Sequence, residues 1–110
     1  MTVPYAIKAG DLEPPIDATL LQADGTPVDL TAAAAVRCLV RRKAATSLTV
    51  DRDATVITAA AGTVRLAWQA GETDTPGTYQ LEFEITWPGS RKQTVPAWPV
   101  YTFVIYPDLN

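Results

Sequence analysis

The sequence of 110 residues contains no histidine and a single cysteine, Cys38. Without histidine, the chain lacks the side chain that most often serves as a general base near neutral pH and most often binds metals. A lone cysteine cannot form a disulfide within the chain. Cys38 stands in the alternating segment AVRCLVRR, where the pattern predicts a small buried apolar residue.

Charge is sparse, and long apolar runs are missing. Lysine and arginine number 9 and aspartate and glutamate number 12, which gives a formal net charge of −3. The one basic run, Arg41 to Lys43, is too short to form the basic face that nucleic-acid binding requires. No apolar run approaches the roughly 20 residues of a membrane span, and the N-terminus lacks the pattern of a secretory signal. We therefore expect no nucleic-acid partner, no membrane partner and assembly in a cytoplasm.

Side chains that could build an active site are not grouped in the sequence. The two serines fall in expected loops and have no histidine to activate them. Asp51 and Asp53 share a strand face, but two carboxylates are too few for a calcium site. Glu82 and Glu84 are expected to be solvated charges on an outward face. The sequence thus predicts no catalytic residue, no metal site, no cofactor and no enzymatic activity.

Short segments that alternate apolar and polar residues make up most of the chain, between nine prolines and six glycines. This two-residue period is typical of antiparallel strands with one face on a core and the other in water. The segments are Ile16 to Leu20, Val36 to Val40, Val50 to Thr58, Val64 to Trp68, Tyr79 to Trp87 and Tyr101 to Ile105. Turns are expected at ADGTP, at AATSL, at AAAG before Thr63 and in the polar loop PGSRKQ.

The alanine-rich segment TAAAAV is ambiguous, because alanine favours a helix but a single helical turn is too short to be stable alone.

Two half-buried antiparallel sheets pack most economically face to face. The sequence therefore predicts an all-β fold: one domain spanning residues 1–110, an immunoglobulin-like antiparallel sandwich of about seven or eight strands without a disulfide. A small barrel is the structural alternative.

A polar turn that contains Asp74 and Gly77 leads into the strand that opens with Tyr79. In immunoglobulin-like sandwiches, a tyrosine near the start of strand F donates its hydroxyl to the backbone a few residues upstream and forms a tyrosine corner. Tyr79 stands two residues before Leu81, an inward position, as the corner requires. The alternative interpretation is that Tyr79 is only the first inward aromatic residue of its strand.

Candidate contact residues lie on loops and on outward strand positions. Trp98 stands between two prolines that stiffen its loop, and tryptophan is enriched at interface hot spots. Alternatively, its ring folds back over the end of the sandwich. Leu39 and Tyr106 occupy the outward phase of their strands, as do Leu21 and Val104. If these four cluster, they form an apolar patch suited to a partner.

The order of several motifs adds a further indication. Gly10-Asp11 and Pro14-Pro15 precede an alternating strand, an Asp24-Gly25 turn and the segment PVDLT. WQAGET and PGTY follow in the second half, and the combination spans nearly the whole chain. In this order the motifs resemble the N-terminal immunoglobulin-like domain of phage baseplate upper proteins. Ala32 departs from that pattern, because glycine often follows Leu-Thr in the family.

The resemblance implies a non-enzymatic structural protein of a tailed bacteriophage virion, in the tail or baseplate. Its partners would be other virion proteins, attached through a sandwich edge or a loop end, and virion symmetry would supply many copies. One alternative is a capsid or neck decoration protein with the same fold. Another is a host-glycan-binding module that uses Trp98 or Trp87 as a stacking platform.

Overall fold

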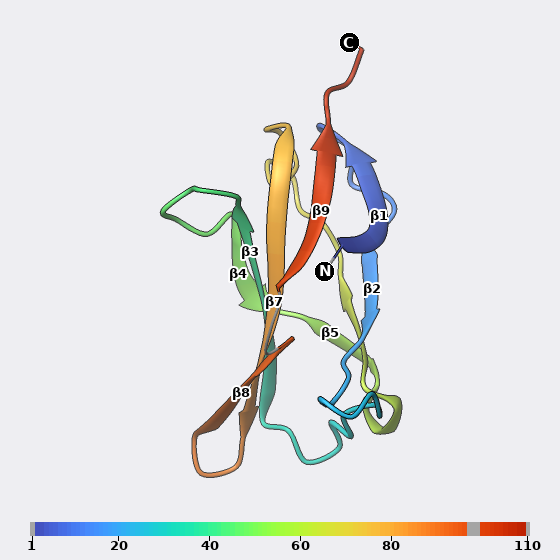
Figure 1. Cartoon of the computed structure of the whole chain (residues 1–110), viewed down its shortest axis with the longest axis vertical. Helices are drawn as coiled ribbons and strands as arrows, with labels where there is room; N and C mark the ends of the chain where they lie inside the picture. The colour runs from blue at the N-terminus through green and yellow to red at the C-terminus, as the bar shows by residue number, and fades with distance from the viewer. Residues whose placement is uncertain (1, 97–99, 110) are drawn as a thin grey trace.

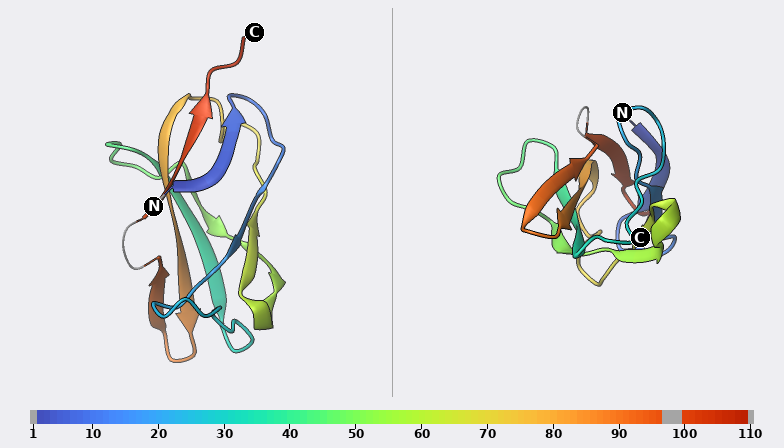
Figure 2. Two further views of the ribbon diagram at one scale, coloured as in Figure 1. Left: turned by 45° about the vertical axis from the view of Figure 1, so that its right-hand side comes forward. Right: turned by 90° about the horizontal axis from the view of Figure 1, so that it is seen from below.

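Two β-sheets form the structure, a computed structural model that describes residues 2–96 and 100–109 (Figure 1). The larger sheet has six strands in the order β1-β9-β7-β3-β4, with β8 paired to β7, and the smaller sheet has the order β2-β6-β5. The strands are β1 (Thr2–Lys8), β2 (Ile16–Thr19), β3 (Ala35–Arg42), β4 (Val50–Asp53), β5 (Thr55–Thr58), β6 (Thr63–Leu66), β7 (Gly77–Trp87), β8 (Arg91–Val95) and β9 (Tyr101–Tyr106). The two sheets face each other as layers (Figure 2). The predicted all-β sandwich is confirmed.

The core fills the space between the sheets because each long strand turns every second side chain inward. In the central pair, β3 and β7 run antiparallel, with Cys38 opposite Phe83 and Val40 opposite Leu81. On the smaller sheet, Ile16 stands opposite Leu66. All six of these side chains are buried. The period of two seen in the sequence therefore marks the buried face correctly.

The distribution of strands between the sheets follows the immunoglobulin pattern. In chain order, the second, fifth and sixth strands form the smaller sheet, and the third, fourth, seventh and last belong to the larger one. Immunoglobulin sandwiches divide strands B, D and E from strands C, C′, F and G in this way. The first strand, β1, lies beside β9 and runs parallel to it, whereas the sequence predicted antiparallel pairing throughout. Alternation does not encode strand direction, so this pairing left no sign in the sequence.

The segment from Val50 to Thr58 is two strands rather than one. It divides at Ala54, whose N–H donates to the carbonyl of Val36, and the chain passes there from the larger sheet to the smaller (Figure 1). The expected loop PGSRKQ is also shorter than predicted, because β8 already begins at Arg91. These two differences raise the strand number from the predicted seven or eight to nine among the described residues.

The two alanine-rich segments form turns. The first is a turn at residues 31–32, after which β3 begins at Ala35. The second is a short 3₁₀ helix, η1 (Ala59–Ala61), which ends at Gly62 with φ +70°. A Cβ on Gly62 would stand 2.5 Å from the carbonyl oxygen of Val28, so only glycine fits between these segments.

Candidate functional site

Tyr79 lies at the start of β7 with its ring in the core and only 2% of its surface exposed. Its hydroxyl donates to the carbonyl oxygen of Thr75 at 2.5 Å, four residues upstream. The ring stacks on Phe103 with 5.7 Å between centroids. Burial raises the pKa of the Tyr79 hydroxyl, which therefore stays protonated and able to donate.

The rest of this turn places Gly77 and Asp74 differently. Gly77 has φ +151°, a value that favours glycine, and a Cβ on it would stand 2.6 Å from Nε of Arg42. Asp74 is exposed and lines a shallow depression with Pro76. The buried polar residue of the loop is instead Thr73, whose hydroxyl donates to the carbonyl oxygen of Asp11 at 2.8 Å. Thr73 was not predicted from the sequence, because no local pattern separates it from the other polar residues of the loop.

Replacing Tyr79 by phenylalanine is expected to lower the free energy of unfolding by about 1 kcal/mol, since the carbonyl of Thr75 loses its donor. Urea unfolding followed by tryptophan fluorescence measures the change. Tyr106→Phe is the matched control: Tyr106 is half exposed, and its replacement should leave the midpoint unchanged. Equal midpoints for the two variants would contradict a stabilising role of the Tyr79 hydroxyl.

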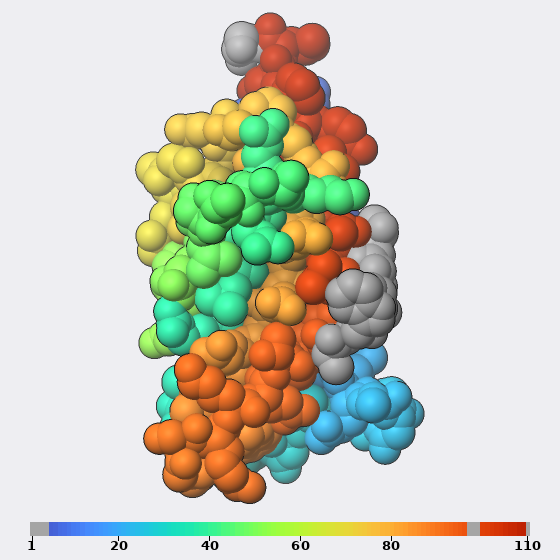
Figure 3. All heavy atoms as spheres, turned by 60° about the vertical axis from the view of Figure 1, so that its left-hand side comes forward, coloured from blue at the N-terminus to red at the C-terminus, as the bar shows by residue number. Residues whose placement is uncertain are grey.

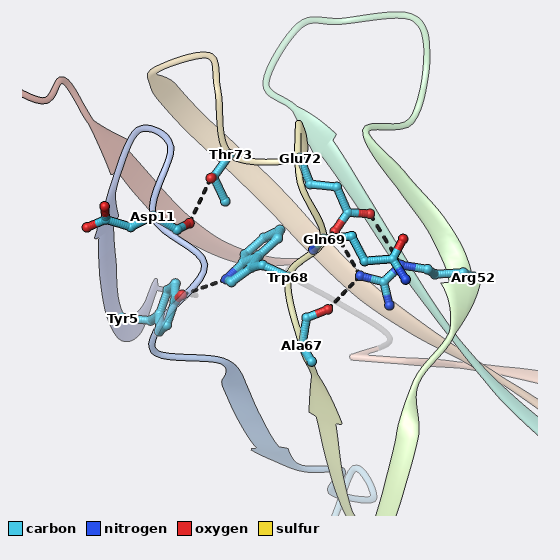
Figure 4. Close-up of polar contacts among 8 residues, drawn as sticks. All are labelled: Tyr5, Asp11, Arg52, Ala67, Trp68, Gln69, Glu72 and Thr73. Atoms are coloured by element: carbon cyan, nitrogen blue, oxygen red, sulfur yellow. Dashed lines mark hydrogen bonds and ion pairs between the residues drawn. The ribbon is translucent and has the colours of Figure 1, made fainter.

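A second polar contact joins the first strand to the segment that follows the sixth (Figure 4). Nε1 of Trp68 donates to the hydroxyl oxygen of Tyr5 at 2.7 Å. That hydroxyl in turn donates to the carbonyl oxygen of Pro14 at 2.6 Å. Burial raises the pKa of Tyr5. These two hydrogen bonds satisfy the polar atoms of both rings, so Trp68 can lie in the core and Tyr5 can pack against it.

Arg52 and Glu72 form a third, charged contact (Figure 4). Nε and Nη2 of Arg52 donate to Oε2 and Oε1 of Glu72 at 3.2 and 2.8 Å. Nη2 also donates to the carbonyl oxygen of Ala67 at 2.6 Å, and the N–H of Gln69 donates to Glu72 at 2.7 Å. The pair therefore clamps the edge strand β4 to the loop between β6 and β7. This contact was not predicted from the sequence. In the structure Arg52 stands opposite the buried Cys38, a position in which its charge needs a partner.

The predicted contact residues do not gather in one patch. Leu39 is half-buried on the outer face of the larger sheet, where it lines a depression with Leu48 and Val100. Figure 3 shows this face, with the β3–β4 loop standing out from it. Tyr106 lines a separate depression beside β1, and Leu21 lies in an isolated bridge with Pro27. Val104 is half-buried on β9, which is separated from β3 by β7. Trp98 lies outside the described residues.

Two of the charged candidates form ion pairs on the surface. Asp51 forms an ion pair with Arg37, and Glu84 forms one with Lys92. Over residues 2–96 and 100–109, no three histidine, cysteine, aspartate or glutamate side chains group as metal ligands would. The same residues include no helix with the length and apolarity needed to cross a membrane.

Cys38 is fully buried opposite Phe83, and burial raises the pKa of its thiol to about 12. Because the thiolate is the reactive form, we expect almost no reaction of the folded protein with a thiol reagent such as DTNB at pH 8. One thiol per chain should react when the protein is unfolded in guanidinium chloride. Rapid, complete labelling without denaturant would contradict this placement.

The polar contacts described here all join one part of the fold to another. No buried side-chain nitrogen or oxygen in the described part of the chain lacks a hydrogen-bond partner. Other molecules can reach the backbone at the open edges of the two sheets: β1, β4 and β8 on the larger sheet, and β2 and β5 on the smaller one. They can also reach shallow depressions on the sheet faces. The sequence matches no protein-family model and no curated protein.

Proposed function

We propose that the protein is a non-enzymatic structural component of a tailed bacteriophage virion, in the tail or baseplate, where it attaches to other virion proteins. The observation that carries the proposal is the open sandwich: both sheets end in strands whose outer backbone is available for pairing. The order of the sequence motifs, which resembles that of phage baseplate upper proteins, supports the assignment to a virion.

The proposed attachment relies on rigid presentation. The central strands are held by the core, and the Arg52–Glu72 contact fixes the edge strand β4 against the β6–β7 loop. An edge strand that is already ordered can pair with an extended segment of a partner, and only the partner then loses conformational entropy on association. Virion symmetry repeats each contact, so a modest affinity per copy is sufficient. Assembly takes place in the host cytoplasm, and the mature location is the particle.

Quantitative mass spectrometry of purified particles tests the proposal. Particles of the phage that encodes the chain are separated into heads and tails, and peptides of this protein are counted in each fraction. We expect the peptides in the tail fraction, in a constant ratio to the major tail protein. Peptides confined to the head fraction would instead favour a capsid decoration protein, and their absence from particles would overturn the virion assignment.

A further inference from the structure

The margin formed by β5 differs from the other strand edges of the molecule. β5 bounds the smaller sheet, and β6 is its one strand partner in the described part of the chain. All four of its residues are exposed, with 41% of Val56 and 48% of Ile57 accessible to solvent. Over residues 2–96 and 100–109, no second strand pairs with its outer edge. Its outer N–H and C=O groups can therefore template pairing with a further strand.

Charge separates β5 from the other edge strands. Proteins protect open edges with charged side chains, because a charge at the junction opposes the pairing of two sheets. Each of the other edge strands that the structure describes carries at least one charge: Lys8 on β1, Asp17 on β2, Asp51, Arg52 and Asp53 on β4, and Arg91 and Lys92 on β8. β5, with the sequence TVIT, has none and consists of β-branched residues alone. Such residues favour strand structure.

We infer that β5 pairs antiparallel with β5 of a second copy of this chain, which joins two three-stranded sheets into one. A two-fold axis perpendicular to the sheet makes the contact self-complementary. Side chains that face the same side must stand opposite each other, so a pairing centred on Val56 sets Val56 against its equivalent and Thr55 against Ile57. Both exposed apolar side chains of β5 are then covered in each copy.

The surroundings of β5 suit a second copy. The strand brings no charge to the junction, so two identical edges meet without repulsion. On the same sheet, the charges of Asp17 and Arg65 are already paired, with Nε to Oδ1 at 2.7 Å and Nη2 to Oδ2 at 3.0 Å. A pairing of four residues per copy is short beside a standard interface of about 1,600 Å². The association is therefore weak in dilute solution and becomes effective where an assembly concentrates the copies.

Sedimentation equilibrium of the full chain, from about 10 µM to about 1 mM, tests the inference by mass action. The weight-average mass should rise from monomer toward dimer. Ile57→Lys should weaken the association at least about tenfold, because it adds like charges at the junction. The matched control is Leu48→Lys, at a residue equally exposed on the β3–β4 loop, and it should leave the association unchanged. Urea unfolding establishes that both variants are folded, and Thr55→Lys replaces Ile57→Lys if that variant is not.

Amide NMR spectra of the unaltered chain give a second readout. Peaks of residues 55–58 should shift with concentration more than those of the other strands. A chain that stays monomeric throughout the range would overturn the inference. So would a dimer that persists in the lysine variants of β5, one that Leu48→Lys disrupts equally, or shifts centred on another strand. Self-association in solution does not depend on a location in the virion, so these results are separate from those of the particle analysis.

Discussion

Replacing Phe103 by alanine is expected to lower the free energy of unfolding by about 3–5 kcal/mol, the usual cost of deleting a buried aromatic ring. Phe103 lies on β9 and is 1% exposed. Three rings surround it, with centroid distances of 5.7 Å to Tyr5, 5.9 Å to Trp68 and 5.7 Å to Tyr79. Its removal leaves a cavity where β1, β7, β9 and the segment after β6 meet. Each of the three surrounding rings carries a polar atom held in a hydrogen bond, which keeps the ring from moving into the cavity.

Guanidinium unfolding followed by far-UV circular dichroism measures the effect. A loss of this size approaches the whole stability of a typical domain, about 5–15 kcal/mol, so Phe103→Leu serves as a milder companion with a smaller shift in the same direction. Leu48→Ala is the surface control and should change the free energy by no more than about 0.5 kcal/mol. If Phe103→Ala and Leu48→Ala gave equal midpoints, Phe103 would not be a centre of the core.

The second large effect is expected at Glu72. Glu72→Ala removes two hydrogen bonds from Arg52 and one from the N–H of Gln69. The guanidinium of Arg52 is then left without its carboxylate in a site where only 27% of its side chain is exposed. Because a charged group loses its partner in a partly buried place, we expect a cost of about 2–3 kcal/mol.

The exposed pair of Asp17 and Arg65 is the matched control. Its geometry is equally bidentate, but its side chains are 53% and 45% exposed. Asp17→Ala should therefore cost less than about 1 kcal/mol, and 1 M sodium chloride should diminish that cost further by screening. The cost of Glu72→Ala should change little with salt. A larger loss from Asp17→Ala than from Glu72→Ala would show that the clamp does not hold β4 to the β6–β7 loop.

The buried face of each strand could be predicted from the sequence, because a half-buried strand alternates apolar and polar residues along the chain. Phe83 and Leu81 alternate with charged or polar neighbours, and a strand with that pattern has one orientation that buries its apolar side. The inward phase of Trp68 was readable in the same way. The sandwich follows from this alternation, since two sheets that each have one apolar face must cover each other.

Contacts between segments that are distant in the sequence could not be predicted, because no local pattern marks them. Trp68 and Tyr5 are 63 residues apart, and neither neighbourhood indicates that their polar atoms meet. Arg52 and Glu72 are 20 residues apart and come together only after the chain changes sheets at Ala54. Because the chain changes sheets at Ala54, β5 becomes an edge strand without a charged residue. The alternation of Val50 to Thr58 could not predict this position. Pairing across a fold depends on topology, and a period of two carries no information about topology.

Cryo-electron microscopy of the intact particle tests the central claim, that this open sandwich is an attachment module of the virion tail. We expect density for the two-layered fold in repeated copies on the tail or baseplate, with neighbouring proteins touching its strand edges or loop ends. Density for the chain on the head alone, or a tail fully explained by other proteins, would contradict it.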